Sequence, residues 1–231
     1  MNQHPTRPAA ILFDLDGTLL DSLASIGVAM NEALASLGLP THPIDAYRRF
    51  VGDGVRVLAE RVLAPEQHHH IAALLAAYRP LYRARQLDAP AYDGIFEMLS
   101  ALEAAGIPMC VLTNKPDDLA LEIVGALFRE TRFVVVRGER EGVPKKPDPT
   151  QALELAAAVG VEPASCWFVG DTPTDIATAK NAGMRPIAVL WGFRGRDELE
   201  RAGAETLVDA PAALVRLALS ASSSRGSDPG A

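Results

Sequence analysis

Short apolar runs that alternate with helical patterns constrain the fold of this chain more than any other feature. Strand-like runs occur at residues 9–13, 107–112, 133–136, 166–169, 186–190 and 206–208. Helical patterns lie between them at residues 94–105, 116–128, 149–159 and 174–182. Strands that alternate with helices indicate a parallel sheet that is covered by helices on both faces. The sequence therefore predicts an α/β fold.

The interval between residues 21 and 89 differs, because it shows helical periodicity and no convincing strand. A first helix is indicated by apolar residues at helical spacing, namely Ile26, Met30, Ala33, Leu34 and Leu37. A second helix is expected around residues 55–62. A third should run from Pro65 towards Ala84, with a break or kink at Pro80.

These patterns divide the chain into two expected domains. Residues 1–20 and 90–219 should form the core, and residues 21–89 should form a helical cap that is inserted after the first strand. Residues 220–231 are rich in Ser, Gly and Asp, which predicts a disordered tail.

Composition and charge exclude several classes of function. The chain has 231 residues and a formal net charge of −7, and it contains no block of Lys and Arg that would bind nucleic acid. No apolar run approaches the roughly 18 residues that span a membrane. Residues 1–8 lack the apolar core of a signal peptide. We therefore expect a cytoplasmic protein with no nucleic-acid or membrane partner; these patterns carry no information on its oligomeric state.

The first polar cluster, Asp14-Leu15-Asp16-Gly17-Thr18, directly follows the opening strand. Two acids two residues apart in an extended segment can face the same side, and Gly17 permits a tight turn. One carboxylate could attack phosphorus, while the other protonates the leaving oxygen and later activates water. Asp and Gly are also common in ordinary turns, but a hydrophobic strand that feeds directly into the pair favours a functional site.

Two further clusters offer groups that could hold an anion. Thr113, Asn114 and Lys115 follow the second strand, where a hydroxyl and backbone N–H groups can cradle phosphate, although Thr and Asn are also ordinary N-caps. Lys145 and Lys146 lie among prolines just before a helix, and either ammonium could reach phosphate. Lys146 is favoured because it directly precedes Pro-Asp-Pro, and a solvated basic turn is the alternative.

The fourth cluster spans residues 170–175 and follows the strand at residues 166–169. Mg²⁺ prefers oxygen ligands and is usually held by few carboxylates. Asp171 at the strand end could bind it, and Asp175, one helical turn later, could ligate it directly or hold a coordinated water. A helix start that is enriched in acids, which the helix dipole favours, is the alternative interpretation.

The four clusters together offer a nucleophile, an acid/base, a phosphate clamp and a metal site. Ligands of open α/β sheets bind beyond the carboxyl ends of the strands, so we expect these groups to meet there. Phosphoryl transfer needs mainly positioning and charge neutralisation. Mg²⁺ and Lys146 would offset the repulsion between Asp14 and a phosphate dianion.

The order of these motifs resembles that of the haloacid dehalogenase-like superfamily. The matching motifs are Asp14-x-Asp16-Gly-Thr, Thr113-Asn114, Lys146-Pro and Gly170-Asp171-x-x-x-Asp175. The resemblance covers nearly the whole chain apart from the two tails. It implies a Rossmann-like parallel sheet core with an inserted helical cap.

The resemblance also implies roles for individual residues. The carboxylates of Asp14 and Asp171 and the main-chain carbonyl of Asp16 would bind the metal, with Asp175 supporting it. The groups that would contact phosphate are Thr113, Asn114 and Lys146.

Within that superfamily the chain looks most like the phosphoglycolate phosphatases. Residues 50–54, 147–149 and 191–193 carry this closer resemblance. The Gly52-Asp53-Gly54 turn is the preferred substrate-contacting segment of the cap, because it could bring backbone close to a small substrate.

Two departures from that subgroup fall near the expected mouth of the site. Arg137-Gly138-Glu139 stands where a Gly-Gly-Asp-like turn is frequent, and Phe193-Arg194 stands where Tyr and Asn are frequent. Both bear on the choice of substrate and leave the expected reaction unchanged.

We therefore expect a phosphoric monoester hydrolase of carbohydrate metabolism that depends on Mg²⁺ and acts on a small phosphorylated metabolite. 2-Phosphoglycolate is the leading candidate, with an aspartyl-phosphate formed on Asp14 and Asp16 as the acid/base. A sugar-phosphate mutase with the same core, or a non-catalytic binding protein on this fold, are the alternatives. A dehalogenase fits less well, because its chemistry does not need Asp16 to protonate an alkoxide.

Overall fold

The computed structural model describes residues 7–220 of the chain. Ser220 ends the last helix, so the expected disordered tail is wrong at that residue. The rest of the expected tail, residues 221–231, lies outside the described residues.

Six parallel strands form the central sheet. The strands are β1 (Ala10–Phe13), β2 (Met109–Pro116), β3 (Phe133–Glu139), β4 (Cys166–Gly170), β5 (Arg185–Val189) and β6 (Leu207–Val208). Their spatial order is β3-β2-β1-β4-β5-β6, with every neighbouring pair parallel. The α/β fold with a Rossmann-like core is therefore confirmed. The strand order reverses between β1 and β4, which is where such sheets bind ligands.

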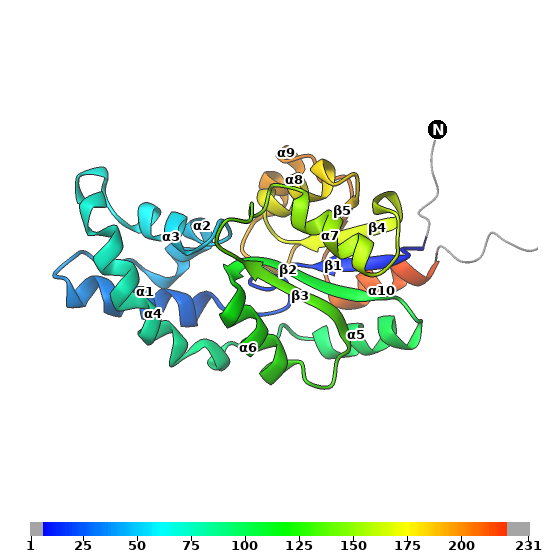
Figure 1. The fold of residues 1–231 in the computed structure, drawn as a ribbon, viewed down its shortest axis with the longest axis horizontal. Coiled ribbons are helices and arrows are strands. Elements are labelled where there is room, and N and C mark those ends of the chain that lie inside the picture. The colour runs from blue at the N-terminus through cyan, green and yellow to red at the C-terminus, as the bar shows by residue number, and fades with distance from the viewer. Residues whose placement is uncertain (1–6, 221–231) are drawn as a thin grey trace, which may run out of the picture.

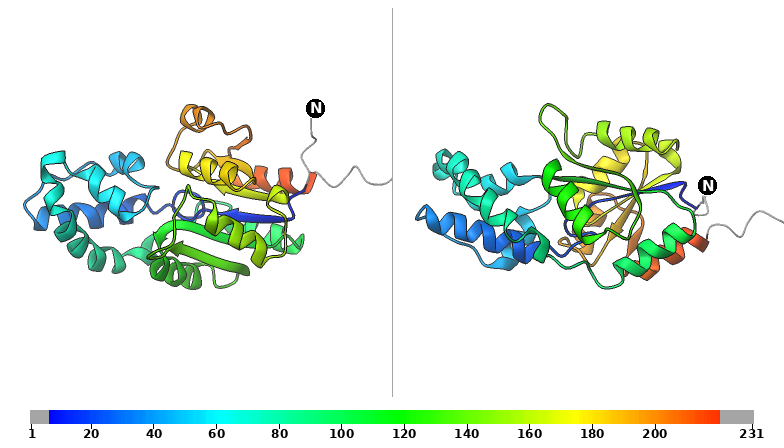
Figure 2. Two further views of the ribbon diagram at one scale, coloured as in Figure 1. Left: turned by 45° about the horizontal axis from the view of Figure 1, so that its top comes forward. Right: turned by 60° about the horizontal axis from the view of Figure 1, so that its bottom comes forward.

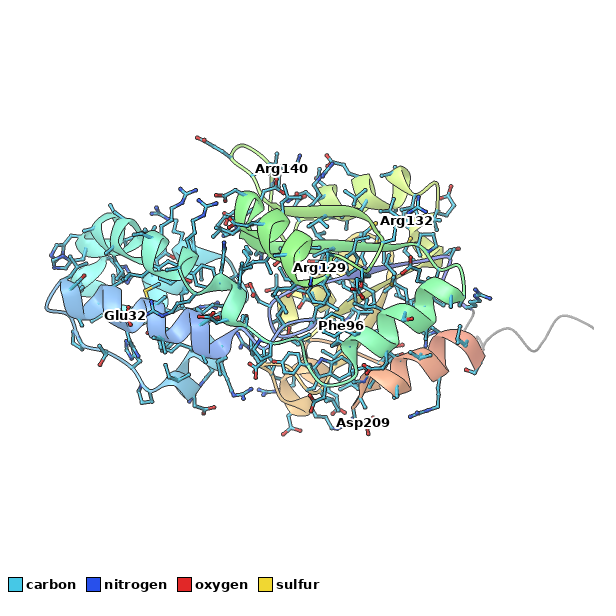
Figure 3. The ribbon with its side chains drawn as sticks, turned by 90° about the horizontal axis from the view of Figure 1, so that it is seen from below. Glu32, Phe96, Arg129, Arg132, Arg140 and Asp209 are labelled. Atoms are coloured by element: carbon cyan, nitrogen blue, oxygen red, sulfur yellow. The ribbon has the colours of Figure 1, made fainter. Side chains whose placement is uncertain are left out.

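Helices cover both faces of this sheet (Figures 1 and 2). One face carries α5 (Ile95–Ala104), α6 (Asp117–Leu127) and α10 (Pro211–Ser220). The other face carries α7 (Thr150–Ala158), α8 (Pro173–Asn181) and α9 (Arg196–Arg201), with a 3-10 turn at Pro163–Ser165. Figure 3 shows α5 and α10 side by side on the first face. Alternate strand residues point to opposite faces, so both faces are apolar and both are buried.

The helices between β1 and β2 other than α5 form a separate unit at one end of the molecule (Figure 1). Its helices are α1 (Leu23–Ser36), α2 (Tyr47–Phe50), α3 (Val55–Val62) and α4 (Ile71–Arg83). Its 3-10 turns are Ile44–Ala46, Pro65–His70 and Gln86–Asp88. These helices bury their own apolar cluster, to which the core contributes Leu119 and Phe193.

The expected break at Pro80 is wrong, because α4 continues through it to Arg83. Pro80 lies in the last turn of the helix, where its missing N–H removes only one hydrogen bond, and its carbonyl still accepts from the N–H of Ala84 at 3.1 Å. The chain instead changes from a 3-10 turn to α-helix between His70 and Ile71.

The two segments that join the helical unit to the core lie side by side. Leu20 forms an antiparallel bridge with Ala91, and the N–H of Asp21 donates to the carbonyl of Pro90 at 2.9 Å. We propose residues 21–89 as the cap, since the entry and exit then form one double-stranded hinge. Within residues 7–220, no helix is long and apolar enough to cross a bilayer.

Candidate active site

Asp14 is the first residue beyond β1, at the point where the strand order reverses. Its N–H donates to the carbonyl of Val169 at 2.9 Å, which fixes it beside the end of β4. The turn after it depends on Gly17, which has a φ of +86°. A Cβ at this position would collide with the carboxylate of Asp171, so the glycine allows the two acidic segments to approach each other.

Lys146 connects two of the acids. Its Nζ lies 2.9 Å from Oδ1 of Asp14 and 2.7 Å from Oδ1 of Asp175, and its side chain is 1% exposed. Lys145, the alternative from sequence, points elsewhere, because its Nζ donates to the carbonyl of Asp53 at 2.8 Å. The structure therefore brings Lys146 and not Lys145 to Asp14.

Asp171 and Asp175 occupy different surroundings. Asp171 is fully buried and accepts hydrogen bonds from Thr18 Oγ1 at 3.1 Å and from the N–H of Phe193 at 2.8 Å. Asp175 is the N3 residue of a capping box whose N-cap is Thr172. Its Oδ2 accepts hydrogen bonds from the hydroxyl and the N–H of Thr172. With Lys146 on its other oxygen, Asp175 has both oxygens engaged, which favours the supporting role that its position suggested over direct ligation.

The acids fit a divalent metal ion. One carboxylate oxygen from each of Asp14, Asp171 and Asp175 lies within 4.8 Å of the others, and all three residues are buried. Oxygen donors of this kind suit Mg²⁺. Three carboxylates face the single ammonium of Lys146, so the cluster carries excess negative charge that a cation would offset.

The pKa shifts of these groups come first from burial and then from the neighbouring charges. Burial raises the pKa of Asp14 to about 7, with a further rise from Asp175, while the ammonium of Lys146 opposes the shift. Burial also raises the pKa of Asp171, and the carboxylates of Asp175 and Asp14 add to it. For Lys146, burial lowers the pKa, but Asp14 and Asp175 outweigh it and the pKa is raised overall.

The polar cluster of the second strand lies within β2, which continues to Pro116 instead of ending at residue 112 as expected. The strand is extended because, after a register shift, Pro116 still pairs with Glu139 of β3. The expected turn at residues 137–139 is for the same reason part of β3. Thr113, Asn114 and Lys115 are all buried at the cavity described next.

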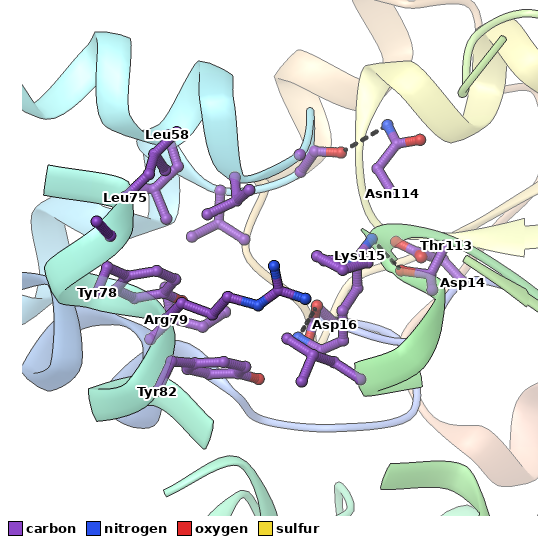
Figure 4. Close-up of a pocket in the computed structure, with 18 residues that line it drawn as sticks. Asp14, Asp16, Leu58, Leu75, Tyr78, Arg79, Tyr82, Thr113, Asn114 and Lys115 are labelled. Atoms are coloured by element: carbon purple, nitrogen blue, oxygen red, sulfur yellow. Dashed lines mark hydrogen bonds and ion pairs between the residues drawn. The ribbon is translucent and has the colours of Figure 1, made fainter. Parts of the chain in front are cut away.

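A cavity of about 370 Å³ separates this strand-end cluster from the cap. Its core wall includes Asp14, Asp16 and Thr113, and its cap wall is mostly apolar, with Ile26, Leu58 and Leu75. Figure 4 shows the two walls facing each other across the cavity. A group bound at Asp14 would therefore extend towards the cap.

The Gly52-Asp53-Gly54 turn rests on the core. The side-chain amide of Asn114 donates to the carbonyl of Gly52 at 3.2 Å, and Gly52 and Gly54 line the cavity (Figure 4). Asp53 points away from the cavity lining and accepts hydrogen bonds from Thr174 and Arg61. The turn thus presents backbone to the cavity while its one side chain fastens it to α8.

The two departures noted in the sequence both lie where cap and core meet. A guanidinium nitrogen of Arg194 donates to the carbonyl of Val51 at 2.9 Å, and Phe193 packs into the cap cluster. Glu139 lies 3.6 Å from the ammonium of Lys145, beneath Gly54.

Sequence reasoning named Lys115 in the second cluster but gave it no role of its own, and it missed Tyr82. Lys115 Nζ lies 2.6 Å from Oδ2 of Asp16, and it lies 4.7 Å from the ring centroid of Tyr82 on α4. The signal for Lys115 was its place two residues after Thr113 in one strand. The signal for Tyr82 was its i,i+4 spacing from Tyr78, with which it stacks at 5.4 Å.

The fold and the strand-end acids define an α/β enzyme core in which acids and one buried lysine meet at the switch point of the sheet. The chain belongs to the haloacid dehalogenase-like hydrolases, whose family model matches residues 11–189. The relatives described next include phosphatases, and the chain is accordingly a phosphoric monoester hydrolase.

Several relatives resemble the chain over most of its length. A phosphoglycolate phosphatase of Xanthomonas campestris pv. campestris (strain 8004) is 36% identical over 209 residues, which are 90% of this chain and 95% of the relative. A phosphoglycolate phosphatase of Aquifex aeolicus is 35% identical over 188 residues, which are 79% and 85% of the two chains.

Solved structures show the same architecture. A protein from Lactobacillus delbrueckii subsp. bulgaricus superposes with a TM-score of 0.87 at 29% identity, covering 92% of this chain and 99% of that one. CbbY from Rhodobacter sphaeroides, in complex with xylulose-1,5-bisphosphate, gives a TM-score of 0.73 at 27% identity over 89% and 95% of the two chains.

Proposed function

We propose that this hydrolase is a Mg²⁺-dependent phosphatase of a small phosphorylated metabolite, with 2-phosphoglycolate as its leading substrate. The observation that carries the proposal is the contact of Lys146 with Asp14 at the switch point of the sheet, where one buried ammonium faces a cluster of acids. The names of the relatives from Xanthomonas and Aquifex support the choice of substrate.

The first step is attack of an Asp14 carboxylate oxygen on phosphorus. The new bond gives an aspartyl-phosphate, and the bond between phosphorus and the leaving oxygen breaks. Asp16, two residues along, gives its proton to the leaving oxygen as the alcohol departs. Lys146 lies against Asp14 and holds positive charge beside the phosphoryl group.

The second step returns Asp14 to its starting state. Asp16, now ionised, takes a proton from water as the water oxygen attacks phosphorus, and the bond between Asp14 and phosphorus breaks. Inorganic phosphate leaves with one oxygen from water. The same carboxyl group therefore serves as acid in the first step and as base in the second.

The metal would be held by the carboxylates of Asp14 and Asp171 and the main-chain carbonyl of Asp16. When bound, Mg²⁺ neutralises phosphate charge and polarises a phosphoryl oxygen. Asp175 would keep Lys146 and the start of α8 in place through its two engaged oxygens.

Phosphate binding by Thr113, Asn114 and Lys146 would be coupled to the cap. The amide of Asn114 donates to the carbonyls of Gly52 and Lys146, at 3.2 Å and 3.1 Å. For that amide to reach a phosphate it must leave one of these carbonyls, and Gly52 belongs to the cap turn. Binding of the phosphate would thus act on the turn that closes the cavity.

The test is a screen of phosphate monoesters with the purified full-length chain and Mg²⁺, reporting kcat/KM for each. The expected result is release of inorganic phosphate, with 2-phosphoglycolate among the best substrates. An isomerised phosphate ester as product would replace the proposal with a mutase. If none of the esters is turned over, a non-catalytic binding protein would replace the proposal.

A further inference from the structure

Lys115 is a buried cation in the cavity that the proposed phosphoryl transfer leaves without a role. Its side chain is 4% exposed, and it lies on β2 among the residues that line the cavity. Thr113 and Lys115 both line the cavity, although the register of β2 shifts between Leu112 and Pro116. They are separated by about 6.6 Å of extended chain. A ligand whose phosphate lies at Thr113 would therefore place its next few atoms beside Lys115.

The ammonium of Lys115 is held by the proposed acid/base. Its Nζ lies 2.6 Å from Oδ2 of Asp16, whose side chain is 12% exposed. The other oxygen of Asp16, Oδ1, is buried and makes no hydrogen bond of good geometry among the described residues. The contact with Lys115 fixes where the carboxylate of Asp16 lies, so the position of Asp16 relative to the leaving oxygen of a substrate depends on Lys115.

The opposite wall provides little competing charge. The cap residues that line the cavity are mainly apolar, and the described lining includes one further cation, Arg79. Arg79 extends from the cap towards Asp16 (Figure 4), but its side chain is 67% exposed and pairs with Asp118 at 3.2 Å. A negative group on the substrate would therefore find its buried counter-charge at Lys115.

We infer that Lys115 determines specificity by exchanging the carboxylate of Asp16 for an anionic group on the leaving group. The inference rests on the proposed function and names its substrate class, the phosphate monoester of a short hydroxy acid. The exchange replaces one buried ion pair with another, so the ammonium stays paired while the carboxylate of Asp16 is released, can take up a proton from water and can then give that proton to the leaving oxygen.

A neutral leaving group cannot make this exchange. It would leave Lys115 bound to Asp16, or it would leave a buried ammonium unpaired if Asp16 moved away, and both states disfavour turnover. The hydroxyl of Tyr82 adds to the recognition site. It is buried near Lys115, whose ammonium can donate only to its oxygen, so its hydrogen is available to donate to an incoming carboxylate.

The test compares two esters that differ in one charge, 2-phosphoglycolate and the phosphate ester of glycolamide, in which a carboxamide replaces the carboxylate. The wild-type full-length chain should favour 2-phosphoglycolate by at least about 100-fold in kcat/KM, as expected for a buried charge pair. Lys115→Met should reduce that ratio to about 10-fold or less.

Lys145→Met is the matched control. It removes the same charge next to the same cavity, where Lys145 holds the backbone of Asp53, and it should leave the ratio between the two esters unchanged. A Lys115→Met variant that loses activity on both esters by the same factor would overturn the inference, because Lys115 would then act only on Asp16.

Binding separates this inference from the proposed function. In an Asp14→Asn background, which cannot turn over, calorimetry should show that Lys115→Met weakens binding of 2-phosphoglycolate and has a smaller effect on the carboxamide. Equal losses for the two ligands would overturn the role of Lys115 even if the wild-type chain hydrolyses neither ester. Hydrolysis of both esters by the wild type without preference would also overturn the role of Lys115, while the proposal that the chain is a phosphatase would stand.

Discussion

The two walls of the cavity differ in how closely they are constrained. On the core wall, the charged groups are paired, Asp14 with Lys146 and Asp16 with Lys115, and none of these four side chains is more than 12% exposed. On the cap wall, the lining is mostly apolar, and its attachments to the core include the turn at residues 52–54. A substitution on the core wall breaks a network of ion pairs, while a substitution on the cap wall alters the shape of the cavity. Chemistry should therefore respond to core substitutions and the fit of the substrate to cap substitutions, with Lys115 as the one proposed core residue that also selects the substrate.

The largest effect is expected at Asp14. Replacing it with Asn removes the nucleophile but keeps the size of the side chain, so turnover should fall by at least about 10⁵-fold. Phosphate release measures the loss, and thermal unfolding should show that the fold is kept. Retained turnover with an intact fold would remove Asp14 as the nucleophile.

The next largest effect is expected at Lys146. Lys146→Met removes the only ammonium that contacts both Asp14 and Asp175 among the described residues, and kcat should fall by about 10³-fold. Lys145→Met is the control, because its ammonium holds the cap turn instead of Asp14, and its loss should be much smaller. Equal losses in the two variants would contradict the assignment of Lys146.

The sequence predicted the core wall better than the cap wall. Asp14, Asp16 and Asp171 follow buried strands, and the topology of a parallel sheet brings such strand ends together. The choice of Lys146 over Lys145 rested on one proline, and only the contacts distinguish the two.

Contacts between segments distant in the chain could not be predicted in the same way. Lys115 meets Asp16 across 99 positions, and Tyr82 reaches Lys115 only because α4 passes Pro80 without breaking. The extension of β2 to Pro116 depends on pairing with β3, and no local pattern carries that information.

The third largest effect is expected at Asp171, where a substitution should change the dependence of activity on Mg²⁺. Asp171→Asn keeps the size of the side chain but removes its charge and one of its two acceptor oxygens, so the Mg²⁺ concentration for half-maximal activity should rise by about 100-fold. Activity titrated with Mg²⁺ after treatment with a chelator measures this shift. A titration identical to that of the wild type would contradict a metal-binding role for Asp171.

The smallest effect concerns the attachment of the cap turn. Thr174→Val removes the hydroxyl that donates to Asp53, a loss of about 1 kcal/mol. The attachment of the cap turn to α8 should weaken, so KM for 2-phosphoglycolate should rise about five-fold while kcat changes little. Thr178→Val is the control, because Thr178 bonds to the backbone of its own helix and does not touch the cap.

The pH dependence of this attachment follows from Asp53. Burial alone would raise the pKa of Asp53, but hydrogen bonds from Thr174 and Arg61 outweigh it and hold the pKa below its ordinary value. A lowered pKa in the folded state means that the ionised carboxylate stabilises the attachment above its ordinary pKa, and that this stabilisation is lost only as the pH falls through the lowered value. The difference in KM between Thr174→Val and the wild type should therefore be constant from pH 6 to pH 8. A difference that disappears within that range would show that another group, and not Asp53, fastens the turn to α8.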